Sequence, residues 1–195
     1  MATLVTNPAP DFTATAVMAD GSFDEAFTLS SQKGKYVVLF FYPLDFTFVC
    51  PSEIIAFDRK LSEFKSRGCE VIGVSVDSHF THFAWRETAP EAGGIGRVGY
   101  PLVADLSKQI ARDYGILLNE SVALRGLFLI DKEGVVRHST INDLPIGRNI
   151  DEAVRTLDAL IFHETHGDVC PADWKDGDDA MTPSAEGVAS YLASH

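Results

Sequence analysis

Three cysteines, at positions 50, 69 and 170, are the side chains of this sequence that could carry out redox chemistry. They are too few and too widely spaced for a disulfide scaffold. None belongs to a C-x-x-C pair, the pattern typical of zinc ribbons and thioredoxin-type dithiols. In a reducing compartment such thiols are either inert or reactive, and the surroundings of each thiol decide which.

Cys50 lies where a helix is expected to begin. It follows the apolar run 35–42 and precedes Pro51, which suits the first helical position. A helix N-terminus favours a thiolate over a thiol, but contributes only about 1–2 kcal/mol, so a nearby cation is also needed. Arg125, just before an expected strand, is a candidate on the assumption that neighbouring strand ends gather at one site. The residues alone leave open whether Cys50 is reactive or a buried structural thiol.

The other candidate residues favour structural roles. Cys69 adjoins an expected strand and is interpreted as a small buried hydrophobe. His79/His82 and His163/His166 have the spacing of two ligands on one helical face, but no third ligand stands nearby in sequence. We therefore predict surface or capping histidines, and expect neither a metal nor a cofactor.

The elements that would position these residues follow from the apolar pattern. Runs at 35–42, 70–76 and 126–130 are typical of strands buried on both faces. Helical stripes alternate with them, so the pattern predicts an α/β sheet flanked by helices. The turn 131–134 predicts a final antiparallel hairpin and hence a mixed sheet. The stripes are Ile54, Phe57, Leu61 and Phe64, and Ile150, Val154, Leu157 and Ile161.

The composition changes after Phe162, where residues 163–179 are rich in turn formers and acids. We expect a domain at 1–162 and an extended C-terminal arm at 163–195, with Trp174 and Tyr191 as docking anchors. The glycines of segment 90–100 predict a mobile loop.

Composition and charge exclude several classes of partner. The 195 residues are 46% hydrophobic, enough for one full core. The 28 acidic and 16 basic residues give a net charge of −12, which would repel nucleic acid and anionic membrane surfaces. The first residues lack a signal-peptide pattern, and the longest apolar stretch, 36–44, is too short to span a bilayer. We expect a soluble, cytoplasmic protein.

Residues 40–51, Phe-Phe-Tyr-Pro-Leu-Asp-Phe-Thr-Phe-Val-Cys-Pro, closely resemble the peroxidatic motif of typical 2-Cys peroxiredoxins, which include the bacterial alkyl hydroperoxide reductase C subunit. The resemblance covers nearly the whole chain, and its motifs occur in the family's order. It implies a thioredoxin-like mixed α/β sheet flanked by helices. The further matching segments are 74–80, 83–85, 125–131, 142–148 and 167–172.

The same resemblance implies a reaction cycle. Cys50 would attack the peroxide O–O bond and become a sulfenic acid, and Cys170 would resolve it across a head-to-tail homodimer. Five dimers commonly assemble into a decamer in this family. A thioredoxin or a flavoprotein disulfide reductase would then reduce the disulfide. The chain would be an oxidoreductase that reduces hydrogen peroxide and small organic hydroperoxides in antioxidant defence and redox homeostasis.

Five residues match the family's positions around the peroxidatic thiol. Pro43 would shield the pocket from solvent, and Thr47 would hold the peroxide through its hydroxyl. Arg125 would stabilise the thiolate and polarise the peroxide. Glu53 and Arg148 would orient this arginine. The family and the physical argument therefore indicate the same arginine.

Two departures from the family concern over-oxidation. Readily over-oxidised relatives carry Gly-Gly-Leu-Gly and a C-terminal Tyr-Phe, whereas this chain has Gly-Gly-Ile-Gly at 93–96 and Tyr-Leu at 191–192. We expect intermediate sensitivity to conversion of the sulfenic acid to sulfinic acid. Ser52, where many relatives have Thr, retains a small hydroxyl residue.

Two other functions compete with a peroxidase. A thiol–disulfide oxidoreductase would share the fold, but residues 50–53, Cys-Pro-Ser-Glu, lack its second cysteine. An oligomeric holdase chaperone, whose assembly is itself the function, is the alternative from a different class. Replacing Cys50 by Ser would distinguish a peroxidase from a holdase, because peroxidase turnover must vanish whereas holdase activity could survive that change.

Overall fold

The computed structural model describes residues 3–194, which form two compact units divided between Ile150 and Asp151. The first unit contains the main sheet, and the second contains two helices. The boundary predicted at 162/163 separates a peroxidase domain from the arm that carries Cys170. It stays a prediction.

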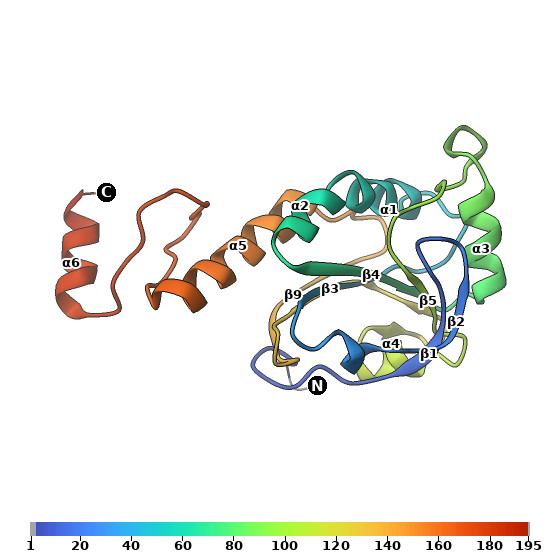
Figure 1. Cartoon of the computed structure of the whole chain (residues 1–195), viewed down its shortest axis with the longest axis horizontal. Helices are drawn as coiled ribbons and strands as arrows, with labels where there is room; N and C mark the ends of the chain where they lie inside the picture. The colour runs from blue at the N-terminus through green and yellow to red at the C-terminus, as the bar shows by residue number, and fades with distance from the viewer. Residues whose placement is uncertain (1–2, 195) are drawn as a thin grey trace. The chain divides into compact units, whose positions relative to one another are not determined.

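A seven-stranded mixed sheet forms the centre of the first unit (Figure 1). Its order is β2-β1-β5-β4-β3-β8-β9, with β4 parallel to both β3 and β5 and the other neighbours antiparallel. The predicted mixed α/β sheet is confirmed. The strands are β1 (Thr13–Val17), β2 (Phe23–Thr28), β3 (Tyr36–Phe41), β4 (Cys69–Ser75), β5 (Leu102–Ala104), β8 (Arg125–Ile130) and β9 (Val136–Asn142), while β6 (Leu117–Leu118) and β7 (Val122–Ala123) form a separate pair.

Helices cover both faces of this sheet (Figure 1). All of β3 is buried: Phe40 stacks on Phe57 of α1 with ring centroids 4.2 Å apart, while Leu39 and Phe41 join a core cluster with Ala111 of α4. Each face of β3 therefore packs on a different helix, as its continuous apolar pattern predicts. The helices are α1 (Cys50–Arg59), α2 (Leu61–Ser66), α3 (His79–Glu87) and α4 (Gln109–Asp113), with short 3₁₀ helices η1 (Leu29–Gln32) and η2 (Pro90–Ala92).

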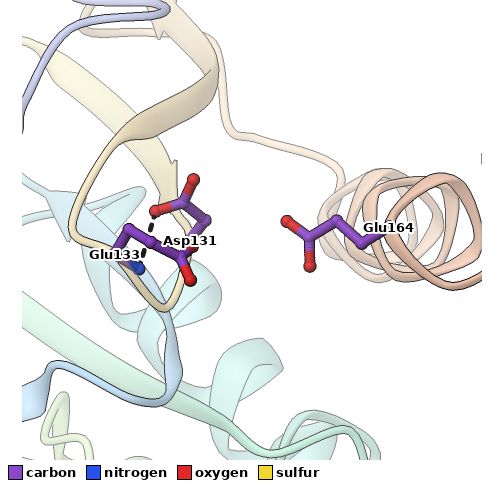
Figure 2. Close-up of side chains that lie close together, drawn as sticks. All are labelled: Asp131, Glu133 and Glu164. Carbon is purple, nitrogen blue, oxygen red and sulfur yellow. Dashed lines mark hydrogen bonds between the residues drawn. The ribbon is translucent and has the colours of Figure 1, made fainter.

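The predicted hairpin turn is closed by a buried carboxylate. Asp131 Oδ1 accepts a hydrogen bond from the backbone N–H of Glu133 at 3.0 Å (Figure 2). It also accepts one from the backbone N–H of Val135 at 2.8 Å. Arg137 Nε donates to the other carboxylate oxygen at 2.5 Å. Gly134 has φ +88°, a left-handed conformation that glycine adopts without steric cost. Asp131 therefore fixes the turn that joins β8 to β9.

The segment expected to be a mobile loop, 90–100, is fastened to α3. Trp85 Nε1 donates to Gly93 O at 2.9 Å, and Gly96 N donates to Thr88 O at 3.1 Å. Gly93 and Gly96 have φ of +82° and +66°, so these glycines allow the backbone turns of this segment.

The second unit is built on α5 (Ile150–His166) and α6 (Ala185–Ser194). Trp174 is buried, with its ring 5.0 Å from that of Phe162, and its backbone carbonyl accepts a hydrogen bond from Arg155 Nη1 at 2.9 Å. Trp174 thus acts as the predicted anchor of its segment. Within residues 3–194, no helix combines the length and the apolar character needed to cross a bilayer.

Candidate active site

Cys50 is the first residue of α1, at the end of a loop that leaves the buried strand β3. Pro51 occupies the first turn of the helix, as the sequence predicts. The thiol therefore lies at the positive end of the helix dipole, which favours a negative charge on sulfur. Cys50 is 0% exposed, so a charge there depends on partners within the protein.

Thr47 supplies one partner from the same loop. Its Oγ1 lies 2.9 Å from Cys50 Sγ and 2.8 Å from Leu44 O, with geometry suited to donation to each. A hydroxyl has a single proton, so these two acceptors share it. A thiolate is a stronger hydrogen-bond acceptor than a backbone carbonyl, and Thr47 can therefore stabilise the ionised sulfur.

Arg125, the first residue of β8, supplies the cation. Its Nη1 donates to Cys50 Sγ at 3.4 Å and to Glu53 Oε2 at 2.7 Å, while Nε donates to Leu144 O at 2.7 Å. The guanidinium is almost fully buried, so its charge is little screened by water. Arg125 therefore favours the thiolate and also offers a donor to an oxygen atom bound beside the sulfur.

Glu53 holds two arginines in place. One of its oxygens accepts from Arg148 Nε and from the Arg148 backbone N–H, both at 2.8 Å, and the other accepts from Arg125 and from Arg148 Nη2. Burial alone would raise the pKa of Glu53, but the hydrogen bonds and charge of Arg148, aided by Arg125, lower that pKa on balance. Glu53 therefore stays ionised near neutral pH.

Arg148 connects this cluster to the sheet. Its Nη1 donates to Phe41 O at 2.9 Å and to Gly126 O at 2.5 Å. These carbonyls lie at the end of β3 and near the start of β8, so one side chain ties both strands to the first turn of α1. The arrangement presents a buried sulfur nucleophile to a small electrophile, with a hydroxyl and a fixed cation directed at the reacting atom.

Comparisons with known proteins identify the family of this chain. Residues 5–139 match the family model of the AhpC/TSA family, and residues 159–194 match that of the C-terminal domain of 1-Cys peroxiredoxin. The chain is 57% identical over 190 residues to alkyl hydroperoxide reductase C of Helicobacter pylori strain J99, which covers 97% of this chain and 96% of the relative. This chain belongs to the AhpC/TSA family.

Further likenesses are to proteins named as peroxiredoxins. Peroxiredoxin-2 of Macaca fascicularis is 54% identical over 189 residues, covering 96% of this chain and 94% of that protein. The reduced 2-Cys peroxiredoxin of Plasmodium vivax superposes with a TM-score of 0.96 at 51% identity, over 98% of this chain and 100% of the other. The predicted typical 2-Cys peroxiredoxin, its thioredoxin-like fold and its class of enzyme, an antioxidant thiol-dependent peroxidase, are confirmed. The holdase alternative is not favoured.

Four predicted residues, Thr47, Glu53, Arg125 and Arg148, lie in one hydrogen-bonded cluster around Cys50 of this peroxiredoxin. Pro43 is buried in the loop between β3 and α1. Its role as a shield stays a prediction.

The other two thiols have different surroundings. Cys69, in β4, is 1% exposed, and burial raises its pKa to about 12, which agrees with the predicted inert core thiol. Cys170 belongs to the second unit, where it is half-buried and its Sγ lies 3.6 Å from Ala159 O. Burial raises the pKa of Cys170, although the nearby charge of Arg155 opposes that rise.

Sequence reasoning missed a buried polar network beneath the Cys50 loop. His82 is 0% exposed, so the expected surface or capping role is wrong for this residue. Its Nδ1 lies 2.7 Å from Asp45 Oδ2 and its Nε2 lies 3.2 Å from Val103 O. Both ring nitrogens of His82 therefore face an oxygen atom within this buried network. Tyr42 Oη donates to the other oxygen of Asp45 at 2.9 Å, which secures the loop two residues before Thr47.

The second histidine pair agrees with the predicted capping role. His163 and His166 lie at the end of α5, where their Nδ1 atoms contact the carbonyls of Asp168 at 2.8 Å and Phe162 at 3.0 Å.

Proposed function

We propose that Cys50 is the nucleophile with which this peroxiredoxin reduces hydrogen peroxide and small organic hydroperoxides. The observation that carries the proposal is the convergence of Thr47 Oγ1 and Arg125 Nη1 on Cys50 Sγ, at 2.9 and 3.4 Å. A hydroxyl that can donate and accept, beside a fixed cation, suits a peroxide held by both of its oxygens.

The reaction is a two-electron displacement. The Cys50 thiolate attacks one peroxide oxygen, an S–O bond forms and the O–O bond breaks. Sulfur is oxidised to a sulfenic acid, and the leaving oxygen takes the bonding electron pair and a proton to become water or an alcohol. Arg125 stabilises the negative charge that moves from sulfur to the leaving oxygen, while Glu53 and Arg148 hold Arg125 in position. Pro43 covers the pocket.

We propose that Cys170 of a second chain resolves the sulfenic acid. Its thiolate attacks Cys50 sulfur, a disulfide forms and the hydroxyl group leaves as water. Cys50 is fully buried and Cys170 lies in the C-terminal arm, 163–195, so both segments must rearrange for the two sulfurs to bond. A dithiol reductant, a thioredoxin or a flavoprotein disulfide reductase, then returns both thiols to the reduced form.

The proposed assembly is a homodimer that associates further into a decamer. An exposed aromatic cluster supports association: Phe23 is 43%, Phe80 66% and Phe83 38% exposed, and Phe23 packs edge-on against both of the others. Exposed aromatic groups of this kind suit a protein interface. We also propose a cytoplasmic location, because three free thiols are typical of a reducing compartment.

Peroxide consumption tests the assignment. Wild type, Cys50→Ser and Cys170→Ser are assayed with thioredoxin and its reductase, and also with dithiothreitol as a small dithiol. Cys50→Ser is expected to be inactive with both. Cys170→Ser should keep the first step but lose thioredoxin-dependent turnover. Residual Cys50→Ser turnover near the wild-type rate would contradict the assignment of the nucleophile.

A further inference from the structure

Loop 43–49 lies between β3 and α1 and carries Thr47, whose hydroxyl lies 2.9 Å from the sulfur of Cys50. A displacement of about 1 Å at such a group can remove much of its effect on the rate. Thr47 belongs to neither a helix nor a strand, so its place beside the sulfur depends on what holds the loop.

Asp45 fastens this loop through three contacts. Its backbone N–H donates to Asp77 Oδ2 at 2.7 Å. Its Oδ1 accepts from Tyr42 Oη at 2.9 Å, and its Oδ2 lies 2.7 Å from His82 Nδ1. In the part of the chain that the structure describes, these are the hydrogen bonds that tie residues 43–49 to segments outside the loop and α1.

The side chains of Asp45, Tyr42 and His82, here called the Asp45 anchor, are almost fully buried. Water therefore competes little for their hydrogen bonds. The anchor also reaches two neighbouring strands of the sheet, because Tyr42 N donates to Val74 O at 3.0 Å and His82 Nε2 lies 3.2 Å from Val103 O. Asp45 is thus held by a rigid part of the fold.

Phe46 joins this fixed residue to Thr47 and has φ +52°, a left-handed conformation that side chains other than glycine rarely adopt. Such a conformation costs free energy and persists where its surroundings fix it. Asp45 holds one side of Phe46, and the contact of Thr47 Oγ1 with Leu44 O at 2.8 Å closes the turn on the other side. Without the anchor, this turn can relax and carry Thr47 away from the sulfur.

We propose that the Asp45 anchor positions Thr47 for peroxide attack. This role rests on the proposed function, because it presupposes that Cys50 is the nucleophile. Among the described residues, the side chains that donate to the Cys50 sulfur are those of Thr47 and Arg125. Asp45 is therefore a positioning residue that acts through Thr47.

Two substitutions at His82 separate the contacts of its ring nitrogens. The amide nitrogen of His82→Asn can take the place of Nδ1 beside Asp45, whereas that of His82→Gln can take the place of Nε2 beside Val103 O. Stopped-flow measurement of sulfenic acid formation compares them. His82→Gln should attack peroxide about three- to tenfold more slowly than wild type, in line with the loss of one hydrogen bond. His82→Asn should restore most of the rate.

Two tyrosines provide a matched pair. Tyr42→Phe removes one donor to Asp45 and keeps the ring, so it should slow attack about two- to fivefold. Tyr114 is also buried, but its Oη donates to Pro10 O at 3.0 Å, outside the anchor. Tyr114→Phe removes a comparable hydroxyl and should leave the rate of attack unchanged.

A double-mutant cycle identifies the route by which the anchor acts. If His82 acts through the hydroxyl of Thr47, its effect disappears when that hydroxyl is absent. His82→Gln should therefore slow Thr47→Val by less than about twofold, although it slows wild type more strongly. A general loss of structure would slow both backgrounds equally.

A spectrum of the threonine methyl groups in the reduced protein tests the anchor without any reaction. The Thr47 signal is identified by its loss in Thr47→Val. It should shift in His82→Gln and Tyr42→Phe, but not in Tyr114→Phe.

The proposal is overturned if His82→Gln attacks at the wild-type rate, if His82→Asn is as slow as His82→Gln, or if the Thr47 signal does not move. It is also overturned if His82→Gln slows Thr47→Val as much as it slows wild type. If Cys50→Ser still consumes peroxide at the wild-type rate, the proposed function fails instead. The methyl spectrum then still decides whether the anchor holds Thr47.

Discussion

Cys50 and Cys170 are both free thiols, but the two units surround them in opposite ways. Cys50 lies at a helix N-terminus with a hydroxyl and a guanidinium directed at its sulfur. Cys170 lies against a backbone carbonyl, and burial raises its pKa. With the proposed roles, this comparison suggests a division of labour: the first unit surrounds Cys50 with donors suited to peroxide attack, whereas Cys170 in the second unit has no such donors at its sulfur among the hydrogen bonds of the described residues.

The largest effect on the rate of peroxide attack is expected from removing the cation beside Cys50. Arg125→Gln should slow peroxide attack by about 10²–10³-fold, the usual cost of losing a fixed donor at a developing anion. Arg155→Gln removes the cation near Cys170 and should leave attack unchanged. Stopped-flow measurement of sulfenic acid formation compares them, and equal rates in the two variants would contradict the division of labour.

Glu53 should stabilise the protein far more than Glu152 of the second unit, which also pairs with an arginine. Glu53→Gln leaves two buried guanidiniums poorly paired, and should lower the free energy of unfolding by about 3–5 kcal/mol. Glu152→Gln breaks a partly exposed pair with Arg155 and should cost about 0.3–0.5 kcal/mol. Urea unfolding of the reduced proteins measures both losses of stability. Similar losses in Glu53→Gln and Glu152→Gln would contradict the larger contribution of Glu53.

The same carboxylate predicts the direction of acid sensitivity. The pKa of Glu53 is lower in the folded protein than its reference value of 4.5, so its ionised form stabilises the fold above pH 4.5. That contribution is lost as the pH falls through the lower, folded value. Wild type should therefore lose stability below pH 4.5 more steeply than Glu53→Gln, and parallel pH profiles would contradict the assignment.

The Thr47 hydroxyl should have a smaller effect than Arg125, because it is a neutral donor. Thr47→Val should slow peroxide attack by about tenfold, the equivalent of one hydrogen bond. Thr47→Ser keeps the hydroxyl and should retain most of the rate. If Thr47→Val and Thr47→Ser react equally fast, the hydroxyl does not act on the sulfur.

The smallest effect is expected in the alkylation of Cys69 and Cys170, the two thiols to which we assign no role in peroxide attack. The pKa of Cys170 is raised above its reference value of 9.0, and that of Cys69 is about 12. The labelling rate of Cys170 should therefore reach half of its maximum only above pH 9.0, while Cys69 stays unlabelled in the folded protein throughout. Peptide mass analysis after iodoacetamide treatment distinguishes them. Labelling of Cys69 below pH 9.0 would contradict its burial.

Much of this site could be predicted from the sequence, although not always for the right reason. The sequence indicates Arg125 on the assumption that neighbouring strand ends gather at one site. In the structure β8 runs antiparallel to β3, with Phe40 opposite Leu127, so the start of β8 lies beside the end of β3. Arg125 does lie beside Cys50, and an antiparallel pair of neighbouring strands places it there.

Local sequence patterns could not predict polar contacts between residues that lie far apart in the chain. His82 lies 37 residues from Asp45, and only the fold shows that both are buried together. The glycines of segment 90–100 predict a mobile loop, but hydrogen bonds fasten this segment to α3 and α1. These bonds join residues whose spacing in the sequence gives no sign of contact. Only the family resemblance indicates roles for Glu53 and Arg148. Their contacts form where α1, β3 and β8 come together, and no local sequence pattern predicts that meeting.

The central claim, that Cys50 of one chain is resolved by Cys170 of another, is tested most directly by mixing two variants that each lack one of these cysteines. Cys50→Ser and Cys170→Ser chains are combined under conditions that exchange subunits, treated with one equivalent of peroxide and analysed by non-reducing mass spectrometry. The account predicts a covalent heterodimer joined through the remaining Cys50 and Cys170, and no such product from Cys50→Ser alone. If the mixture forms none, while oxidised wild type carries the disulfide within single chains, resolution between subunits is contradicted.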